Sequence, residues 1–153
     1  MDGSEFEMRY VYPVTLEKDE DARYVASARD VPEAITDGES KEEALREMSD
    51  ALGAALAGYS IHGWALPLPS DAVAGEWLIP VAPLVAAKLA LRAAMREQGV
   101  SNVALAERLG ISEGAVRRLV NPDHASRLDG VVAALSAIGH RLIIEDQKLI
   151  DAA

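Results

Sequence analysis

The sequence contains no cysteine, few aromatic residues and no long apolar run. The absence of cysteine excludes disulfides, thiol catalysis and cysteine-based zinc sites, and it is compatible with a reducing cytoplasm. Aromatic residues make up 5% of the 153 residues although 50% are hydrophobic, so we expect a core built mostly from Leu, Ile, Val, Met and Ala. No stretch approaches the roughly 18 apolar residues of a membrane-spanning helix, and no signal peptide is apparent. These absences favour a cytoplasmic protein.

The first seven residues are typical of a cloning remnant, because Gly3-Ser4 followed by Glu5-Phe6 is what two common cloning sites encode. We therefore expect the natural chain to begin at Met8. The rest of the sequence predicts a first module at residues 8–80, a linker at 81–83, a second domain at 84–147 and a tail at 148–153.

Charge is divided unequally between the two halves. Residues 8–80 carry 14 acidic and 6 basic side chains, a net charge of −8, whereas residues 81–153 carry 8 acidic and 9 basic side chains, a net charge of +1. The asymmetry indicates two modules with different partners. An acidic surface also serves simply to keep a protein soluble, and charge alone does not separate these two interpretations.

The first half predicts three short strands, one helix and a fourth strand. Alternating apolar residues rich in aromatic and β-branched types predict strands at 9–17 and 23–28, with a short third strand at 35–36. Ser40 and Glu43 form a capping box that predicts the start of a helix, which we expect to end near Gly58 or Gly63. Residues 77–81 form a short apolar run that predicts the fourth strand.

The second half predicts a bundle of helices. Helical spacing of apolar residues predicts four of them, at 84–98, 102–109, 113–120 and 128–138. Ser126 and Asp129 resemble a further capping box, and residues 141–145 predict a last strand. The expected fold class is therefore α+β, a β-β-β-α-β module followed by an all-α domain.

Six residue types at fixed spacing point to a helix-turn-helix of the Cro/C1-type, which binds duplex DNA. They are Asn102, Ala106, Gly110, Ile111, Val116 and Leu119. A small residue at 106 lets two helices cross closely, and Gly110 supplies the left-handed backbone of the tight turn. Ile111, Val116 and Leu119 are expected to pack the second helix on the first. The second helix of such a unit lies in the major groove of DNA.

Candidate DNA contacts follow from this assignment. Arginine forms bidentate pairs with guanine and glutamate accepts from cytosine, whereas residues at helix starts contact phosphates. The candidate residues are Ser101, Asn102, Ser112, Glu113, Arg117 and Arg118. Because the second half is barely basic, we expect dimerisation to supply part of the affinity. Leu142, Ile143 and Ile144 are candidates for pairing between subunits, in a homodimer or homotetramer.

Short motifs in a fixed order extend the argument to residues 8–145. They are Tyr12-Pro13-Val14, Asp30-Val31-Pro32, Thr36-Asp37-Gly38-Glu39-Ser40 with Glu42-Glu43-Ala44, and Leu66-Pro67-Leu68-Pro69-Ser70, followed by the helix-turn-helix. The whole pattern resembles the HicB-type antitoxins of type II toxin–antitoxin systems. The resemblance implies a partial RNase H-like first module that is not a nuclease, and a small basic HicA-type toxin that cleaves mRNA as its partner. It also implies repression of the protein's own operon through operator DNA.

The resemblance suggests residues of the first module as toxin contacts: Tyr10, Tyr12, Asp30, Val31 and Pro32. The charge division fits this implication, because an acidic module suits a basic, RNA-binding partner.

Two other functions were weighed against this interpretation. A metal-dependent nuclease would use the carboxylates Asp30, Asp37, Glu39, Glu42 and Glu43, but turns and helix starts favour acidic residues for local reasons. No two histidines have metal-ligand spacing. We therefore expect no enzymatic activity, no metal and no cofactor. The remaining alternative is a stand-alone transcription regulator whose first module senses a small ligand.

Overall fold

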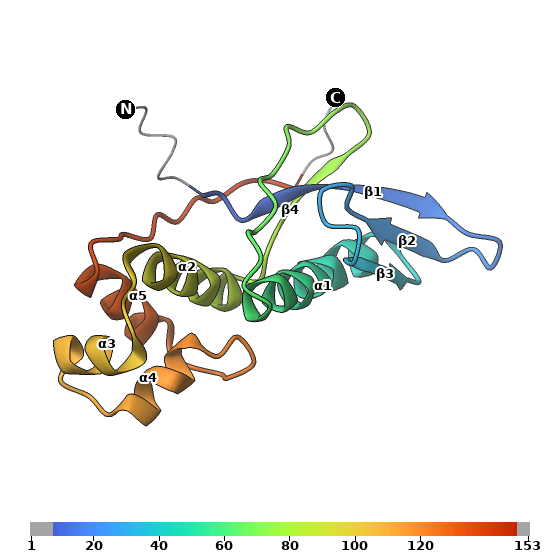
Figure 1. Ribbon diagram of the computed structural model, residues 1–153. Coiled ribbons are helices and arrows are strands. Elements are labelled where there is room, and N and C mark those ends of the chain that lie inside the picture. The colour runs from blue at the N-terminus through green and yellow to red at the C-terminus, as the bar shows by residue number, and fades with distance from the viewer. Residues whose placement is uncertain (1–7, 150–153) are drawn as a thin grey trace. The chain divides into compact units, whose positions relative to one another are not determined.

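The computed structural model describes residues 8–149, and the expected cloning remnant at residues 1–7 and residues 150–153 of the expected tail lie outside the described residues. The elements, labelled in Figure 1, are β1 (Val11–Lys18), β2 (Tyr24–Ser27), β3 (Ile35–Gly38), α1 (Lys41–Ile61), β4 (Trp77–Pro80), α2 (Pro83–Gln98), α3 (Asn102–Leu109), α4 (Glu113–Val120) and α5 (Leu128–Ala137). This order confirms the α+β prediction.

The described chain forms two compact units. The first contains residues 8–82 together with 147–149, and the second is Pro83–Asp146. The division falls inside the expected linker at 81–83, whereas residue 147, expected in the second domain, groups with the first unit.

The first unit is an antiparallel sheet in the order β3-β2-β1-β4, with α1 packed against β2, β3 and β4. β1 is the strand that joins both sides: Thr15 pairs with Ser27 of β2, and Tyr12 pairs with Ile79 of β4. The buried side chains are mostly aliphatic, as the composition predicts, and the largest in this unit include Tyr12, Val14, Val31, Met48, Leu52 and Leu56.

Helix α1 begins where the capping box predicts. The Ser40 Oγ accepts from the Glu43 backbone N–H at 3.1 Å, and the Glu43 carboxylate accepts in return from the Glu39 N–H at 3.0 Å, one residue before the cap. The first bond satisfies a backbone donor that the helix start leaves without a partner, and the second ties the residue before the cap to the first turn. The helix ends at Ile61, with His62 as its carboxyl-terminal cap.

The second unit is helical throughout its regular structure. Helix α2 packs against α4 and α5, and α3 packs against the same two helices. Their shared core contains Ala87, Leu91, Ala94, Met95, Leu105, Ala106, Val116, Val120, Val131, Ala134, Leu135 and Ile138.

Two predictions for the second unit were wrong. Helix α5 starts at Leu128 after Arg127, with no side-chain cap, because the Ser126 hydroxyl bonds to Lys88 of α2 instead of capping the helix. Residues 141–145 form no strand, because no described strand of this unit is present to pair with them. Ile143 and Ile144 are 87% and 81% exposed.

Gly38 lets the end of β3 approach the start of α1 closely. A Cβ at this position would lie 2.7 Å from the backbone nitrogen of Ala44 and 3.1 Å from its Cα. These are backbone atoms of a capped helix and cannot rotate away as a flexible side chain would. Gly58, inside α1, has nothing within 4 Å of the corresponding position.

We therefore expect opposite effects from the same substitution at the two glycines. Gly38→Ala should lower the free energy of unfolding by about 1–3 kcal/mol, since the new methyl group overlaps the helix backbone. Gly58→Ala should raise it by up to about 1 kcal/mol, because alanine favours a helix interior over glycine. Urea unfolding followed by circular dichroism measures both. Equal unfolding free energies for the two variants would contradict the close approach at Gly38.

Candidate nucleic-acid interface and partner groove

The turn between α3 and α4 has the backbone that the spacing predicts. Gly110 ends α3 in the left-handed conformation, with φ 67° and ψ 33°. Ala106 and Val116 are buried where the two helices meet, as expected. Ile111 is the exception, because it is 40% exposed and does not pack into the core as predicted.

The predicted DNA contacts gather at the start and along the outer side of α4, with a second group at the start of α3. Ser101, Ser112, Glu113, Arg117 and Arg118 are exposed, and Asn102 is half-buried. Figure 1 shows α3 and α4 joined by a short turn. Ser112 caps the start of α4.

Both serines cap their helices. The Oγ atoms of Ser101 and Ser112 accept from the N–H groups of Ala104 and Ala115, each at 3.1 Å. Accepting this bond leaves each hydroxyl hydrogen able to donate to a phosphate oxygen. The backbone N–H groups at a helix start favour an anion at the same place.

Arg117 lies near the carboxylate of Glu113 one turn earlier. The Arg117 Nε and Glu113 Oε1 are 3.9 Å apart, and the two side chains are 65% and 48% exposed. An exposed pair at this distance contributes little stability, so the guanidinium can leave it at low cost. The arginine side chain is therefore able to reach a base edge or a phosphate.

The prediction of site residues missed two cations of α2 that hold the far end of α4. Lys88 is fully buried and Arg92 is partly buried, and both donate to backbone carbonyls in the last turn of α4 or just after it. Burial lowers the pKa of the Lys88 ammonium below its ordinary value. Helical spacing could have revealed Lys88, because it follows Leu84 by four residues and precedes Leu91 by three, on the apolar side of α2.

Two of the five predicted toxin contacts lie in the core of the first unit. Tyr12 and Val31 have 0% exposure, so in this structure neither is able to touch a partner. The Tyr12 hydroxyl donates to the Pro67 carbonyl at 2.6 Å, and burial is the main cause that raises its pKa. Both residues support the fold instead, because their side chains fill its interior.

The other predicted toxin contacts remain accessible. Pro32 is exposed, whereas Tyr10 and Asp30 are half-buried. Burial raises the pKa of the Tyr10 hydroxyl to about 12.

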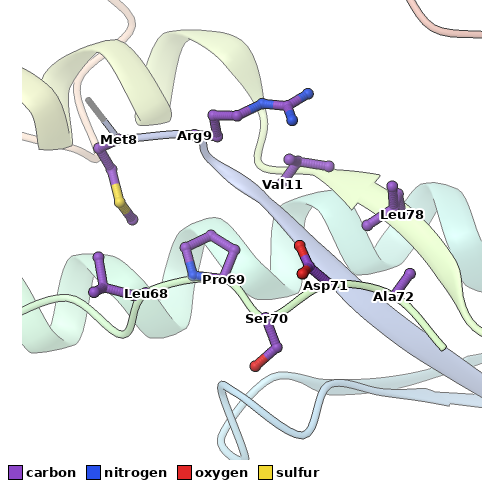
Figure 2. Close-up of a pocket in the computed structure, with 9 residues that line it drawn as sticks. All are labelled: Met8, Arg9, Val11, Leu68, Pro69, Ser70, Asp71, Ala72 and Leu78. Atoms are coloured by element: carbon purple, nitrogen blue, oxygen red, sulfur yellow. The ribbon is translucent and has the colours of Figure 1, made fainter. Parts of the chain in front are cut away.

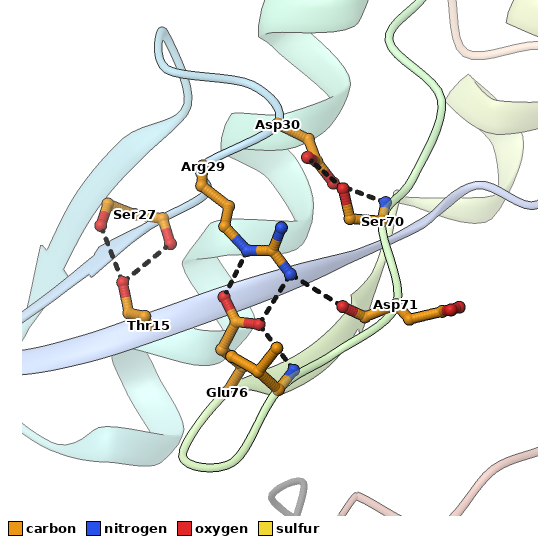
Figure 3. Close-up of polar contacts among 8 residues, drawn as sticks. Thr15, Ser27, Arg29, Asp30, Ser70, Asp71 and Glu76 are labelled. Atoms are coloured by element: carbon orange, nitrogen blue, oxygen red, sulfur yellow. Dashed lines mark hydrogen bonds and ion pairs between the residues drawn. The ribbon is translucent and has the colours of Figure 1, made fainter.

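Two polar anchors fix the segment between α1 and β4, as Figure 3 shows. The Asp30 carboxylate accepts from the backbone N–H and the hydroxyl of Ser70, both at 2.7 Å. Arg29 binds the buried carboxylate of Glu76 through its Nε at 2.9 Å and its Nη2 at 3.0 Å, and it also donates to the Asp71 carbonyl at 2.7 Å. The hydrogen bond from Arg29 is the main cause that lowers the pKa of Glu76. Asp30 therefore positions this segment, in addition to any role at the surface.

The anchored segment forms one wall of an open groove of about 330 Å³. Figure 2 shows residues 68–72 of this wall facing Met8, Arg9 and Val11 near the start of β1, with Leu78 of β4 beside them. Leu68 is 76% exposed and lines the groove. The groove was not predicted, because residues 8–11 and residues 68–78, which are distant in sequence, assemble it.

Four of the five carboxylates considered for a nuclease make structural contacts. Asp37 and Glu39 lie 2.6 and 3.7 Å from Arg23. The Asp30 carboxylate accepts from Ser70, and the Glu43 carboxylate accepts from the Glu39 N–H. Among residues 8–149, no group of three histidine or acidic side chains is placed to hold a metal ion. In the same part of the chain, no helix combines the length and apolar character needed to span a membrane.

Comparison with known proteins gives two family matches. Residues 11–90 match the model described as a HicB-like antitoxin of bacterial toxin–antitoxin systems. Residues 88–122 match a winged helix-turn-helix DNA-binding model, which covers most of α2, all of α3 and all of α4. The strands of a wing are not found among the described residues of the second unit.

Curated relatives cover most of the chain. An Antitoxin HicB 1 of Photorhabdus laumondii is 36% identical over 133 residues, which are 87% of this chain and 84% of that protein. An Antitoxin HicB of Escherichia coli is 36% identical over 131 residues, covering 86% of this chain and 95% of the relative. An Antitoxin HicB of Pseudomonas fluorescens is 35% identical over 124 residues, covering 77% and 82%.

The chain thus combines the sheet, the anchored segment and the helix-turn-helix. The first two relatives are both named as HicB antitoxins, and the match covers most of their length. The protein belongs to the HicB-like antitoxin family of bacterial toxin–antitoxin systems and carries a helix-turn-helix DNA-binding domain.

Proposed function

We propose that this protein neutralises a HicA-type, mRNA-cleaving toxin through its first unit and represses its own operon through its second. The observation that carries the proposal is the union in one chain of a HicB-like module and a DNA-binding domain. The charge division supports it, because the acidic module suits a basic toxin and the second domain is not repelled by phosphate. Both tasks belong in the bacterial cytoplasm.

We propose that the toxin contacts the first unit near the groove. The predicted contact Tyr10 lies next to two lining residues, Arg9 and Val11, and the predicted contact Asp30 holds Ser70 in the opposite wall. The anchors at Asp30 and Glu76 keep that wall in one conformation, which lowers the entropy lost on binding. Leu68 offers an exposed apolar anchor in the same wall.

Co-expression with the product of the neighbouring small gene tests this function. The protein should restore growth that the small protein arrests, and the two should co-purify in fixed proportion. Leu68→Lys should weaken the complex about tenfold or more, because it places a positive charge against a basic partner in an apolar contact. Isothermal titration calorimetry measures the affinity.

The matched control is Ile35→Lys. Ile35 is also exposed and apolar, at 61%, but lies on β3 at the opposite edge of the sheet from β4. Equal affinities for the two variants would remove the groove from the interface. Failure to restore growth or to co-purify would instead favour a stand-alone regulator that senses a small ligand.

We propose that α4 enters the major groove of the operator with Ser112 and Glu113 at its start and Arg117 and Arg118 along its exposed side. Ser101 and Asn102 at the start of α3 contact the phosphate backbone of the DNA. The support is the exposure of these residues together with the cap geometry of both helices.

Arg117→Ala and Arg118→Ala should each weaken operator binding by about 1–3 kcal/mol, the range for a specific base contact. Arg127→Ala, which removes an exposed arginine outside α4, is the control for charge. Fluorescence anisotropy with a labelled duplex from the upstream region measures the affinities. Unchanged affinity in both α4 variants would move the reading surface to another element.

We propose that the protein acts as a homodimer or homotetramer, with the segment around Ile143 and Ile144 paired between subunits. Both side chains are among the most exposed large apolar groups of the described chain. A dimer joins two half-sites and so compensates for the low positive charge of one domain.

Ile143→Asp should lower the molar mass in solution to that of a smaller assembly and weaken operator binding with it, because a buried charge opposes pairing. Light scattering after size exclusion measures the mass. Val73→Asp, at another exposed apolar residue in the first unit, serves as the control. If Ile143→Asp and the control keep the same mass as the parent protein, the segment does not join subunits.

A further inference from the structure

The ammonium of Lys88 lies inside the second unit, surrounded by oxygen atoms. The side chain is 0% exposed and comes from the middle of α2. Its Nζ contacts the carbonyl oxygens of Arg118 and Asn121 at 2.9 Å each, the carbonyl of His124 at 2.6 Å and the Oγ of Ser126 at 2.8 Å. None of these four acceptors is a carboxylate, so neutral dipoles alone stabilise the charge.

The hydrogen bonds around this ammonium form a consistent network. Ser126 donates its own hydroxyl hydrogen to the Arg118 carbonyl at 3.2 Å, so its oxygen is an acceptor toward Lys88. The ring Nδ1 of His124 lies 3.1 Å from the same oxygen and completes the network. Every donor in the network has an acceptor, as a buried polar cluster requires.

The carbonyl groups at the end of α4 need a hydrogen-bond donor from elsewhere because of the sequence that follows the helix. Asn121 precedes Pro122, which disfavours helical backbone, and Asn121 is extended with φ −80° and ψ 113°. The last carbonyls of the helix therefore have no following turn to donate to them. Arg118 and Asn121 use Lys88, and Val120 accepts from the Arg92 Nη1 at 3.1 Å. Two cations thus lie at the negative end of the helix dipole.

We propose that Lys88 is the positioning residue of DNA recognition: its buried ammonium holds the end of α4 and the loop 121–126 on α2, and so fixes the orientation in which α4 presents its exposed side to DNA. The inference rests on the proposed DNA-binding function. The ammonium joins one residue inside α4, one at its cap and two in the loop, and that combination fixes the rotation of the helix as well as its distance from α2.

Without the ammonium, each of the three carbonyls keeps one donor: the Ser126 hydroxyl for Arg118 at 3.2 Å, the His124 N–H for Asn121 at 3.1 Å and the Ser126 N–H for His124 at 2.9 Å. The contact that joins them to α2 is lost, and the space left by the ammonium must be filled by water or by movement of the loop. Either change lets α4 rotate. Contacts to base edges require accurate placement, whereas contacts to phosphates tolerate small movements. Loss of Lys88 should therefore reduce specific binding more than non-specific binding.

The experiment compares the full-length protein with Lys88→Met and with the control Lys18→Met, which removes one exposed positive charge from the first unit. Two duplexes of equal length are used: the upstream segment that the parent protein protects in footprinting, and a scrambled sequence. Lys88→Met should lose about tenfold or more in affinity for the protected duplex, and about twofold or less for the scrambled one. Lys18→Met should change neither.

Chemical rescue separates positioning from a general requirement for folding. The chain has no cysteine, so Lys88→Cys introduces a unique thiol. Aminoethylation of that thiol in denaturant, followed by refolding, rebuilds a lysine-like ammonium, whereas propylation gives a neutral chain of similar length. Specific binding should return with the aminoethyl group alone. Return with both groups, or equal loss on both duplexes in a folded Lys88→Met protein, would overturn the inference.

Amide hydrogen exchange tests the contacts without DNA. Residues 113–127 should exchange faster in Lys88→Met than in the parent protein, and the core of the first unit should be unchanged. Unchanged exchange in residues 113–127 would overturn the inference even if DNA binding fell. If the parent protein protects no upstream segment, the proposed autorepression fails, and the exchange measurement alone decides the role of Lys88.

Discussion

The fold of the second unit depends on the hydrogen-bond partners of the backbone groups at the ends of very short helices. Helices α3 and α4 have eight residues each, so about half of their backbone groups find no partner inside the helix. Such helices are not stable alone. Serine hydroxyls satisfy both starts, Gly110 turns the chain out of α3, and two cations of α2 satisfy the end of α4. The DNA-reading geometry is a product of these end contacts as much as of the apolar core.

In the first unit, side-chain hydrogen bonds hold the long irregular segment between α1 and β4 against the small sheet. The Tyr12 hydroxyl, the Asp30 carboxylate and Arg29 bind this segment at three places. Each of these groups lies in or near a strand. The wall of the groove is therefore held in place by contacts to the sheet.

Much of the fold followed from local sequence, whereas the errors have long-range causes. The cap at Ser40 and the turn at Gly110 depend on neighbouring residues, and both were predicted. Ser126 looked like another cap, but an ammonium from a helix 38 residues away recruits its hydroxyl. A β-like pattern at 141–145 cannot form a strand without another strand to pair with.

The candidate site was predicted in part for the same reasons. The outer side of α4 follows from helical periodicity and the turn, so its exposed arginines could be named in advance. Tyr12 and Val31 belong to conspicuous motifs, but burial depends on the sheet and helix that cover them. To predict the role of Lys88, one would have to infer that a charged residue on the apolar side of a helix is buried and hydrogen-bonded in the interior. One further consequence concerns evolution. On α4 and its cap, Lys88 donates hydrogen bonds only to main-chain carbonyl oxygens. These contacts do not depend on which side chains α4 carries, so the exposed residues of α4 can change in evolution without loss of the contacts that hold the helix.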